Sequence, residues 1–356
     1  MRGRRRYAAG MIFSRRKDQP RDCGPAIADF WQWWHGVRAQ LEKAIEGAGW
    51  DDTLVRLITK KVKAIHPGLV WKHSKGTTSK HILVVCANGD RTLRAIAERW
   101  LAAAPPPDPT WAYHASRQAD PDVFRAGTLT IAGHTVVLQK MRFGIEVDPD
   151  RYEIDVTAFH PIFSVMTEEE QLQVTFLTLD RALGESGVEL WVGRVEASRT
   201  EPQRPHTVIQ LRSAVTNLAQ KVAEDSWAML TGEDLQGYTR AAMAQVPLKP
   251  ARWPRFDTHV RVDLPYRNRR DNGFPHDESL EALRVFEDRL ATAVGPDGQV
   301  VAHETARGRR TLHLYIDGLT RAADVAKRLL PQWREAKATM ATSFDPAWDA
   351  ISHLRG

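Results

Sequence analysis

The chain of 356 residues is 42% hydrophobic and 26% charged, and its net charge is +6. These values are ordinary for a soluble globular protein of two or three domains. No apolar run reaches the roughly 18–20 residues that a membrane helix requires, so we expect no membrane contact. The two cysteines exclude a disulfide scaffold and a cysteine-built zinc site within one chain, which favours a cytoplasmic location.

The positive charge is concentrated at the amino terminus. Residues 1–22 contain eight basic and two acidic side chains, and the other 334 residues are balanced. A basic composition therefore does not indicate a nucleic-acid-binding fold here. We predict that residues 1–24 form a basic, disordered tail, and nucleic acid would bind only through it. An alternative start of translation at Met11 would lower the net charge to +2.

Residues 25–198 are predicted to form an N-terminal α/β domain. Apolar residues recur at helical spacing in several segments, and Thr167 followed by Glu170 is a capping box. The predicted helices are 27–45, 52–65, 92–103 and 167–183. The predicted strands are 69–73, 81–87, 111–115, 128–131, 135–139, 142–147, 153–159 and 189–196. We expect a mostly antiparallel sheet with flanking helices.

The rest of the chain is predicted to contain a connector and a second domain. Residues 199–255 are expected to be a helical connector, with a helix at 207–227 and a segment at 228–250 that lies on the first domain. Residues 256–356 show the order β-α-β-β-α-β, which is typical of the ferredoxin-like plan. These elements are predicted at 259–264, 280–294, 300–304, 311–316, 320–330 and 337–344.

Sequence motifs for catalysis are absent. The chain lacks a nucleophile elbow, a phosphate-binding loop, a dinucleotide fingerprint and a His-Glu-x-x-His motif. We therefore predict no catalytic residue, no cofactor and no metal site. His259, His303 and His313 lie in predicted strands of the last domain and could converge as ligands. Because no Asp or Cys pattern accompanies them, we expect instead that they are surface or half-buried side chains.

Two arginine clusters are the candidate binding residues. One cluster precedes the turn at Asn272, and the other surrounds Gly308. They would form an anion-binding patch if the two loops met, and otherwise they are solvated loop charges. The candidate partner-binding residues are Arg269, Arg270, Asp271, Asn272, Arg309 and Arg310.

The last domain resembles a bacterial domain of unknown function over about residues 257–345. The motifs are Arg270-Asp-Asn-Gly-Phe-Pro275, Phe286-Glu-Asp288, Val301-Ala-His-Glu-Thr305, Gly308-Arg-Arg310 and His313-Leu-Tyr-Ile316. That domain is similar to the regulator of ribonuclease E activity B family. Residues 27–196 resemble bacterial proteins of unknown function that pair with it, through Phe30-Trp31, Leu83-Val-Val-Cys-Ala-Asn-Gly89 and Trp191-Val-Gly193. The resemblance implies a non-enzymatic protein that binds a protein partner.

We therefore expect a binding or regulatory protein that acts through protein–protein contacts. The first alternative is a hydrolase that acts on an anionic substrate in a cleft between the domains. Its candidate residues are His73, His81, His114 and Glu185. The second alternative is an RNA-binding protein that uses the basic tail.

Overall fold

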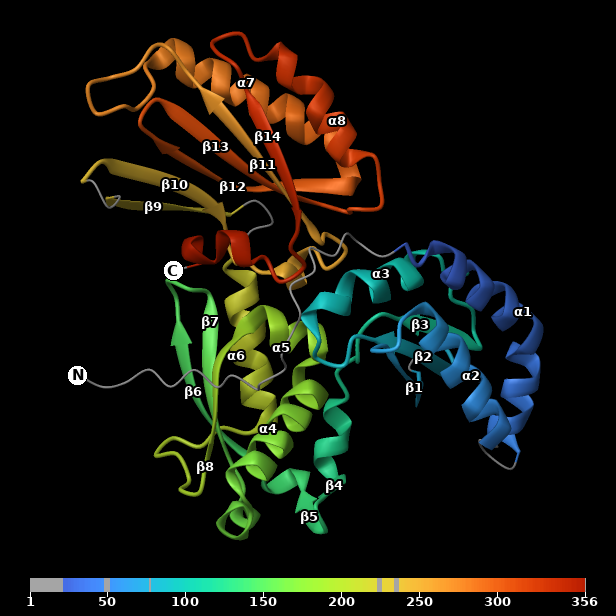
Figure 1. Cartoon of the computed structure of the whole chain (residues 1–356). Coiled ribbons are helices and arrows are strands. Elements are labelled where there is room, and N and C mark those ends of the chain that lie inside the picture. Colours follow the sequence, from blue (N-terminus) through green and yellow to red (C-terminus); the bar gives the residue numbers. More distant parts are fainter. Residues whose placement is uncertain (1–21, 48–51, 77, 223–225, 234–236, 356) are drawn as a thin grey trace.

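The computed structural model describes residues 22–47, 52–76, 78–222, 226–233 and 237–355. Figure 1 shows three lobes, which we call the first lobe (within 22–115), the second lobe (within 116–222) and the C-terminal lobe (within 226–355). Most of the predicted tail lies outside the described residues. The prediction of a tail is wrong for Cys23, which is only 2% exposed and packs in the core of the first lobe.

The first lobe packs helices on a three-stranded sheet in the order β1-β2-β3. The apolar stripe of α1 is buried through Phe30, Trp31 and Trp34, as its helical spacing predicts. The indole nitrogen of Trp34 donates to the hydroxyl of Tyr113 over 2.9 Å. The elements are α1 (Gly24–Glu46), α2 (Asp52–Ile65), β1 (Val70–Lys75), β2 (His81–Cys86), η1 (Arg91–Leu93), α3 (Arg94–Ala102) and β3 (Trp111–His114).

The second lobe has a hydrophobic core of its own. Its elements are η2 (Pro121–Arg125), β4 (Thr128–Ile131), β5 (His134–Val137), η3 (Leu138–Lys140), β6 (Arg142–Asp148), β7 (Glu153–Phe159), η4 (Pro161–Val165), α4 (Glu168–Leu183), α5 (Glu185–Trp191), β8 (Val192–Ser198) and α6 (Val208–Gln220). The predicted capping box of Thr167 and Glu170 is confirmed. The last strand begins at Val192 and not at Glu189, because a separate short helix, α5, occupies Glu185–Trp191.

The predicted antiparallel sheets and flanking helices of the N-terminal region are therefore present, but they are divided between two cores. β1 pairs with β2, β4 with β5 and β6 with β7 in antiparallel fashion. β3 and β8 join their sheets in parallel. Helix α6 packs on the second core through Leu211, Val215 and Leu218.

The C-terminal lobe confirms the predicted order β-α-β-β-α-β. Its elements are β11 (Thr258–Pro265), α7 (Asp277–Val294), η6 (Gly295–Asp297), β12 (Gly298–Ala306), β13 (Arg309–Ile316), α8 (Ala322–Leu329), η7 (Leu330–Gln332) and β14 (Thr339–Phe344). They are followed by η8 (Asp349–Leu354). The strand order β14-β11-β13-β12, with every pair antiparallel, belongs to the split β-α-β plan.

Residues 199–255 differ from the expected helical connector. They contain α6, but β9 (Trp227–Glu233) and β10 (Thr239–Gln245) form a hairpin that extends the C-terminal sheet to six strands. The short η5 (Pro250–Arg252) follows. β10 has alanine at 241, 242 and 244, and alanine has a low intrinsic preference for strands. Pairing with β12 determines its structure.

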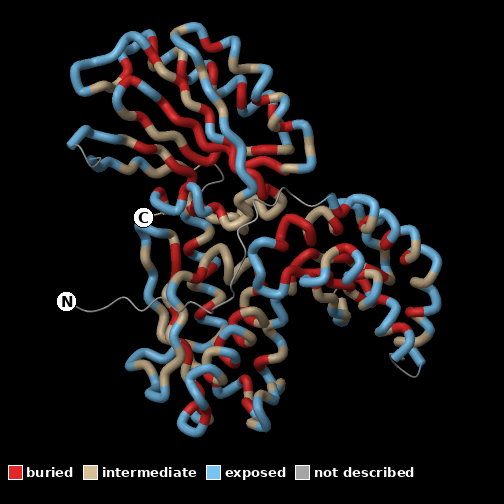
Figure 2. Tube along the Cα trace, viewed as in Figure 1, coloured by how far each residue is buried: buried red, intermediate tan, exposed pale blue. Residues whose placement is uncertain are grey.

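The two faces of the C-terminal sheet have different coverings. Side chains alternate along β13, so Leu312 and Leu314 pack beneath α7 and α8, whereas His313 and Tyr315 lie on the opposite face. We call that opposite face the open face. The segment around Trp348 and η8 covers one end of it. Figure 2 shows buried residues along the strands between these coverings.

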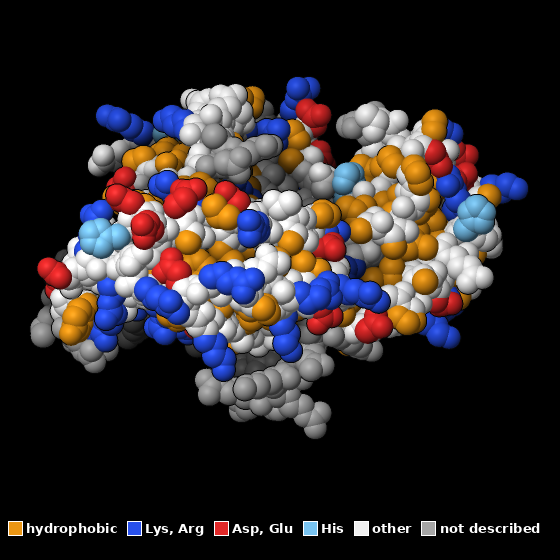
Figure 3. Space-filling model, turned by 90° about the horizontal axis from the view of Figure 1, so that it is seen from above, with side chains coloured by type: hydrophobic (Ala, Val, Ile, Leu, Met, Phe, Trp, Pro, Cys, Tyr) orange, Lys and Arg blue, Asp and Glu red, His pale blue; other side chains and the backbone are white. Residues whose placement is uncertain are grey.

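Charges are mixed on the surface. In Figure 3, which looks down on the C-terminal lobe, basic and acidic side chains are interspersed. This agrees with the balanced charge of the chain beyond residue 22. None of the described helices combines the length and the apolar character that crossing a membrane demands.

Candidate functional site

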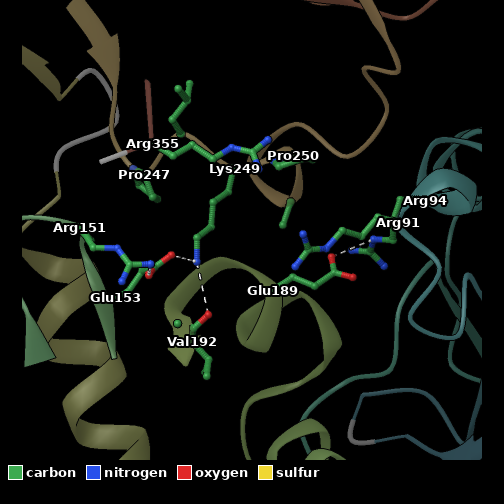
Figure 4. A pocket seen from close by; sticks show the side chains of 13 residues that line it. Arg91, Arg94, Arg151, Glu153, Glu189, Val192, Pro247, Lys249, Pro250 and Arg355 are labelled. Atoms are coloured by element: carbon green, nitrogen blue, oxygen red, sulfur yellow. Dashed lines mark hydrogen bonds and ion pairs between the residues drawn. The ribbon is translucent and has the colours of Figure 1, made fainter. Parts of the chain in front are cut away.

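A cleft of about 260 Å³ lies where the three lobes meet, and it is the candidate functional site. Figure 4 shows its basic side chains entering from separate parts of the chain. The charged residues that line it are Arg91, Arg94, Arg151, Lys249 and Arg355, together with Glu153 and Glu189. Five cations therefore face two carboxylates.

The first lobe supplies Arg91 and Arg94 from the turn that opens α3. Asp90 stabilises this turn, because its carboxylate accepts from the backbone N–H of Thr92 over 2.9 Å. Arg94 is only 4% exposed. Its Nε lies 3.3 Å from Glu189 of the second lobe, and Nη2 donates to Ser186 over 2.8 Å. Arg94 thus joins two lobes, whereas Arg91 is exposed and forms no ion pair with any described residue.

Lys249 connects the C-terminal lobe to the second lobe. Its Nζ lies 2.7 Å from Oε1 of Glu153 and 3.4 Å from the carbonyl of Val192. Glu153 also pairs with Arg151. A Cβ at Gly193 would lie 2.8 Å from the Glu153 carboxylate, so glycine at this position leaves room for that group. One carboxylate is therefore shared by two cations.

The remaining cation, Arg355, enters the cleft and forms no ion pair with an acidic side chain in the part of the chain that the structure describes. Its Nη2 donates to the carbonyls of Ala347 and Trp348, over 2.9 and 2.7 Å. Burial lowers the pKa of Arg355, and the charge of Arg91 lowers it further. Burial also lowers the pKa of Lys249; Glu153 opposes this effect, and Arg91 and Arg151 add to it. The cations of the cleft therefore repel one another, which favours a bound anion.

The sequence did not reveal these residues. They lie between positions 91 and 355, and they form no local motif. The four residues named for an interdomain hydrolase do not line the cleft. His73 and His81 contact each other at 3.3 Å on β1 and β2, and burial lowers the pKa of His114. The Glu185 carboxylate accepts from the backbone N–H groups of Gly89 and Arg117, so it is a structural clamp.

The three histidines of the C-terminal strands lie on two different faces. His259 and His313 meet on the open face, where Nε2 of His259 lies 3.0 Å from Nδ1 of His313. His303 lies on the helix-covered face, 3.1 Å from Glu287 of α7. Sequence reasoning missed Glu304, which lies 3.0 Å from His313. Among the described residues, no group of three or more His, Cys, Asp or Glu side chains is arranged to hold a metal ion.

The two arginine-rich loops do meet. The backbone N–H of Gly308 donates to the carbonyl of Gly273 over 2.8 Å, and the hydroxyl of Tyr266 donates to the same oxygen over 2.6 Å. Gly273 has φ of +82°, and a Cβ there would lie 2.9 Å from the backbone of Arg307. The turn at Asn272-Gly273 therefore needs glycine to bring the loops together.

The six candidate partner-binding residues are distributed over three environments. Four are exposed in the loop before α7, namely Arg269, Arg270, Asp271 and Asn272. The side chain of Arg309 is 54% exposed on the open face. Arg310 is 7% exposed on the helix-covered face, where it pairs with Glu287 at 3.6 Å and donates to Thr305 over 3.1 Å. Arg310 is thus held inside the lobe.

Comparisons with known proteins find a match for one part of the chain. The whole chain matches no curated protein and no solved structure. Residues 238–354, from β10 to the end of η8, match the model described as a family of unknown function, DUF695.

Proposed function

We propose that this protein binds a small anionic ligand in the cleft between its three lobes. The observation that carries the proposal is the pair Arg91 and Arg355, two cations that line one cleft without a carboxylate partner among the described residues. A cluster of guanidinium groups matches the geometry of phosphate and carboxylate. The cleft supplies the donors, and the ligand would supply the missing negative charge.

The size of the cleft limits the ligand. Drug-sized pockets measure roughly 300–1,000 Å³, and this cleft holds about 260 Å³. We therefore expect a compact anion, such as inorganic phosphate, pyrophosphate or a short polycarboxylate. The lining contains no Ser, Thr, Cys or His side chain, which favours binding over a hydrolytic mechanism that uses a nucleophile of the protein.

A ligand in this cleft would contact residues of all three lobes. Its binding free energy would therefore favour the arrangement in which the C-terminal lobe is docked against the other two. This is the basis for a regulatory role: the anion would control the docking of the lobe, and the lobe would present its surface to a partner only in one arrangement.

Replacing Arg91 by Gln is expected to raise the Kd for the best-bound anion at least tenfold. One charge-assisted hydrogen bond is worth about 1.5–3 kcal/mol, and about 1.4 kcal/mol corresponds to a factor of ten. The stability should change little, because Arg91 is exposed and has no ion pair to lose among the described residues. Isothermal titration with phosphate, pyrophosphate and citrate measures the effect.

Arg125→Gln is the matched control for this experiment. The Arg125 side chain is 86% exposed on η2, away from the cleft lining, and its removal should leave the Kd unchanged. Equal Kd values for Arg91→Gln and the wild type would refute the assignment of the cleft. Failure of all three anions to bind the wild type would refute the proposed function itself.

A second candidate function is contact with a protein partner through the two arginine loops. It is favoured by the way Gly273 and Gly308 hold the loops together, with Arg269, Arg270, Asp271 and Asn272 exposed on one side. The resemblance to the regulator of ribonuclease E activity B family supports this kind of partner. Arg310 is left out of the surface, because it is buried against Glu287.

The combined replacement of Arg269, Arg270 and Arg309 by Ala is expected to abolish recovery of bound partners from the native host. The melting temperature should stay close to that of the wild type, because the three side chains are exposed. Arg328→Ala on the exposed side of α8 is the control. Unchanged recovery with the triple variant would exclude the loops as the partner surface.

A further inference from the structure

The open face of the C-terminal sheet contains a second cavity, of about 480 Å³. Every residue that lines it lies within 240–353, inside the segment that matches the family model. It shares no lining residue with the cleft between the lobes. Hydrogen-bonded side chains form its floor, and arginine side chains lie at its edge.

The floor is a chain from a carboxylate to two imidazoles. Oε1 of Glu304 lies 3.0 Å from Nε2 of His313, and Nδ1 of His313 lies 3.0 Å from Nε2 of His259. The same Oε1 lies 3.1 Å from Nε2 of His353, which reaches over from η8. Arg240 of β10 lies 3.1 Å from the other carboxylate oxygen.

With Glu304 ionised and both imidazoles neutral, these hydrogen bonds determine which imidazole nitrogens carry protons. An ionised carboxylate only accepts hydrogen bonds, so Nε2 of His313 is a donor to Glu304. When both imidazoles are neutral, Nδ1 of His313 must accept, and Nε2 of His259 must donate to it. Nδ1 of His259 is then an unprotonated acceptor, since the hydrogen bond that this ring forms among the described residues uses Nε2.

The pKa values of His259 and Glu304 agree with a neutral imidazole and an ionised carboxylate. Burial, and then the proximity of His313, lower the pKa of His259 to about 4, which keeps this imidazole neutral near pH 7. Burial opposes ionisation of Glu304, but the hydrogen bonds from His313 and His353 lower its pKa to about 2. The carboxylate is therefore ionised, as the tautomer argument requires.

The edge of the cavity has more donors than acceptors. Arg261 lies 3.1 Å from Oδ1 of Asp263, Arg309 lies 3.8 Å from the same atom, and the hydroxyl of Thr311 donates to it over 2.6 Å. Oδ1 of Asp263 is thus shared by two guanidinium groups and one hydroxyl group. The Arg261 and Arg309 side chains are 45% and 54% exposed, so their remaining N–H groups are accessible to a ligand.

We infer that this cavity binds a small oxyanion that also carries a hydroxyl group, such as a sugar phosphate. Arg261 and Arg309 would hold the oxyanion, and Nδ1 of His259 would accept from the hydroxyl. His259 and Arg261 are two residues apart on the same face of β11, about 7 Å at roughly 3.4 Å per residue. A five-carbon sugar phosphate spans such a separation, and the cavity volume lies within the usual range for ligand sites.

The chain in which Arg91 is replaced by Gln provides the background for the test, because its cleft is weakened. Isothermal titration with ribose 5-phosphate and with sulfate is compared in this background. We expect ribose 5-phosphate to bind, and the added pair Arg261→Gln and Arg309→Gln to weaken it at least about tenfold. His259→Phe should weaken ribose 5-phosphate binding but not sulfate binding, because sulfate has no hydroxyl to donate.

Nitrogen NMR of the histidine side chains gives a second readout. It is recorded on the wild-type chain, so it needs no folded variant. Nδ1 of His259 should have the resonance of an unprotonated nitrogen, and it should shift when ribose 5-phosphate saturates the wild-type chain. Loss of all ribose 5-phosphate binding in the Arg91→Gln background would overturn the inference, because the cleft would then be the sole site. Unchanged affinity in the arginine pair variant, or an unmoved Nδ1 resonance, would also overturn it.

Discussion

Replacing Arg99 by Met is expected to lower the free energy of unfolding by about 3–5 kcal/mol, because it would leave the buried carboxylate of Asp257 without a cation among the described residues. Arg99 of α3 reaches into the C-terminal lobe, where Nη2 lies 2.8 Å from Asp257 and 2.5 Å from Asp317. Its side chain is only 10% exposed. Burial alone would lower the pKa of Arg99, but the two carboxylates outweigh this effect and raise it. The ion cluster therefore fastens the C-terminal lobe to the first lobe.

Urea unfolding followed by circular dichroism measures this loss. Arg125→Met is the control, because the Arg125 side chain is 86% exposed and pairs with the similarly exposed Asp122 at 3.6 Å, so its removal should cost less than about 0.5 kcal/mol. Adding Asp257→Asn to Arg99→Met should recover part of the loss, since it removes the stranded charge, whereas Asp317 keeps Arg255 at 3.3 Å. A loss below about 1 kcal/mol for Arg99→Met would show that water reaches these carboxylates.

Replacing Trp348 by Ala is expected to cost about 3–5 kcal/mol and to weaken binding in both cavities. Trp348 is fully buried and stacks on Tyr315 with ring centroids 4.0 Å apart. Its indole nitrogen donates to the carbonyl of Phe256 over 3.0 Å. The segment that it anchors carries His353, which reaches the open face, and Arg355, which reaches the cleft. Loosening this segment would therefore remove a residue from each site.

The conservative variant Trp348→Phe separates anchoring from general loss of stability. It keeps a ring against Tyr315 but loses the indole N–H, so we expect a cost of about 1–2 kcal/mol and ligand affinities close to those of the wild type. Isothermal titration with phosphate and with ribose 5-phosphate, below the unfolding transition of each variant, measures both sites. Unchanged affinities in Trp348→Ala would contradict the role of the segment.

Local patterns were sufficient for most helices and strands. The stripe of Phe30, Trp31 and Trp34 predicted α1, and the pair Thr167 and Glu170 predicted the start of α4. The order β-α-β-β-α-β of the C-terminal lobe also followed from alternating periodicities. These features were predictable because each depends on neighbours within a few positions of the chain.

Features without a local signal were not predictable. The sequence did not predict β10, because its alanine residues have a low preference for strands and the strand forms by pairing with β12. The N-terminal region divides into two cores because its strands pair in separate sheets. The two arginine loops meet through contacts between Gly273 and Gly308, thirty-five positions apart. In each case the deciding contact joins residues that are distant in the chain.

Charge shows the same division between sequence and tertiary structure. Counting residues was enough to place the net charge of +6 in the first 22 positions and to show that the rest is balanced. Folding then separated positive from negative charge locally. It brought Arg91, Lys249 and Arg355 to one cleft, and it placed His259, His313 and Glu304 within hydrogen-bond distance on one face of three adjacent strands. Electrostatic interactions depend on distance in space, so only the tertiary structure decided where a balanced chain would attract an anion.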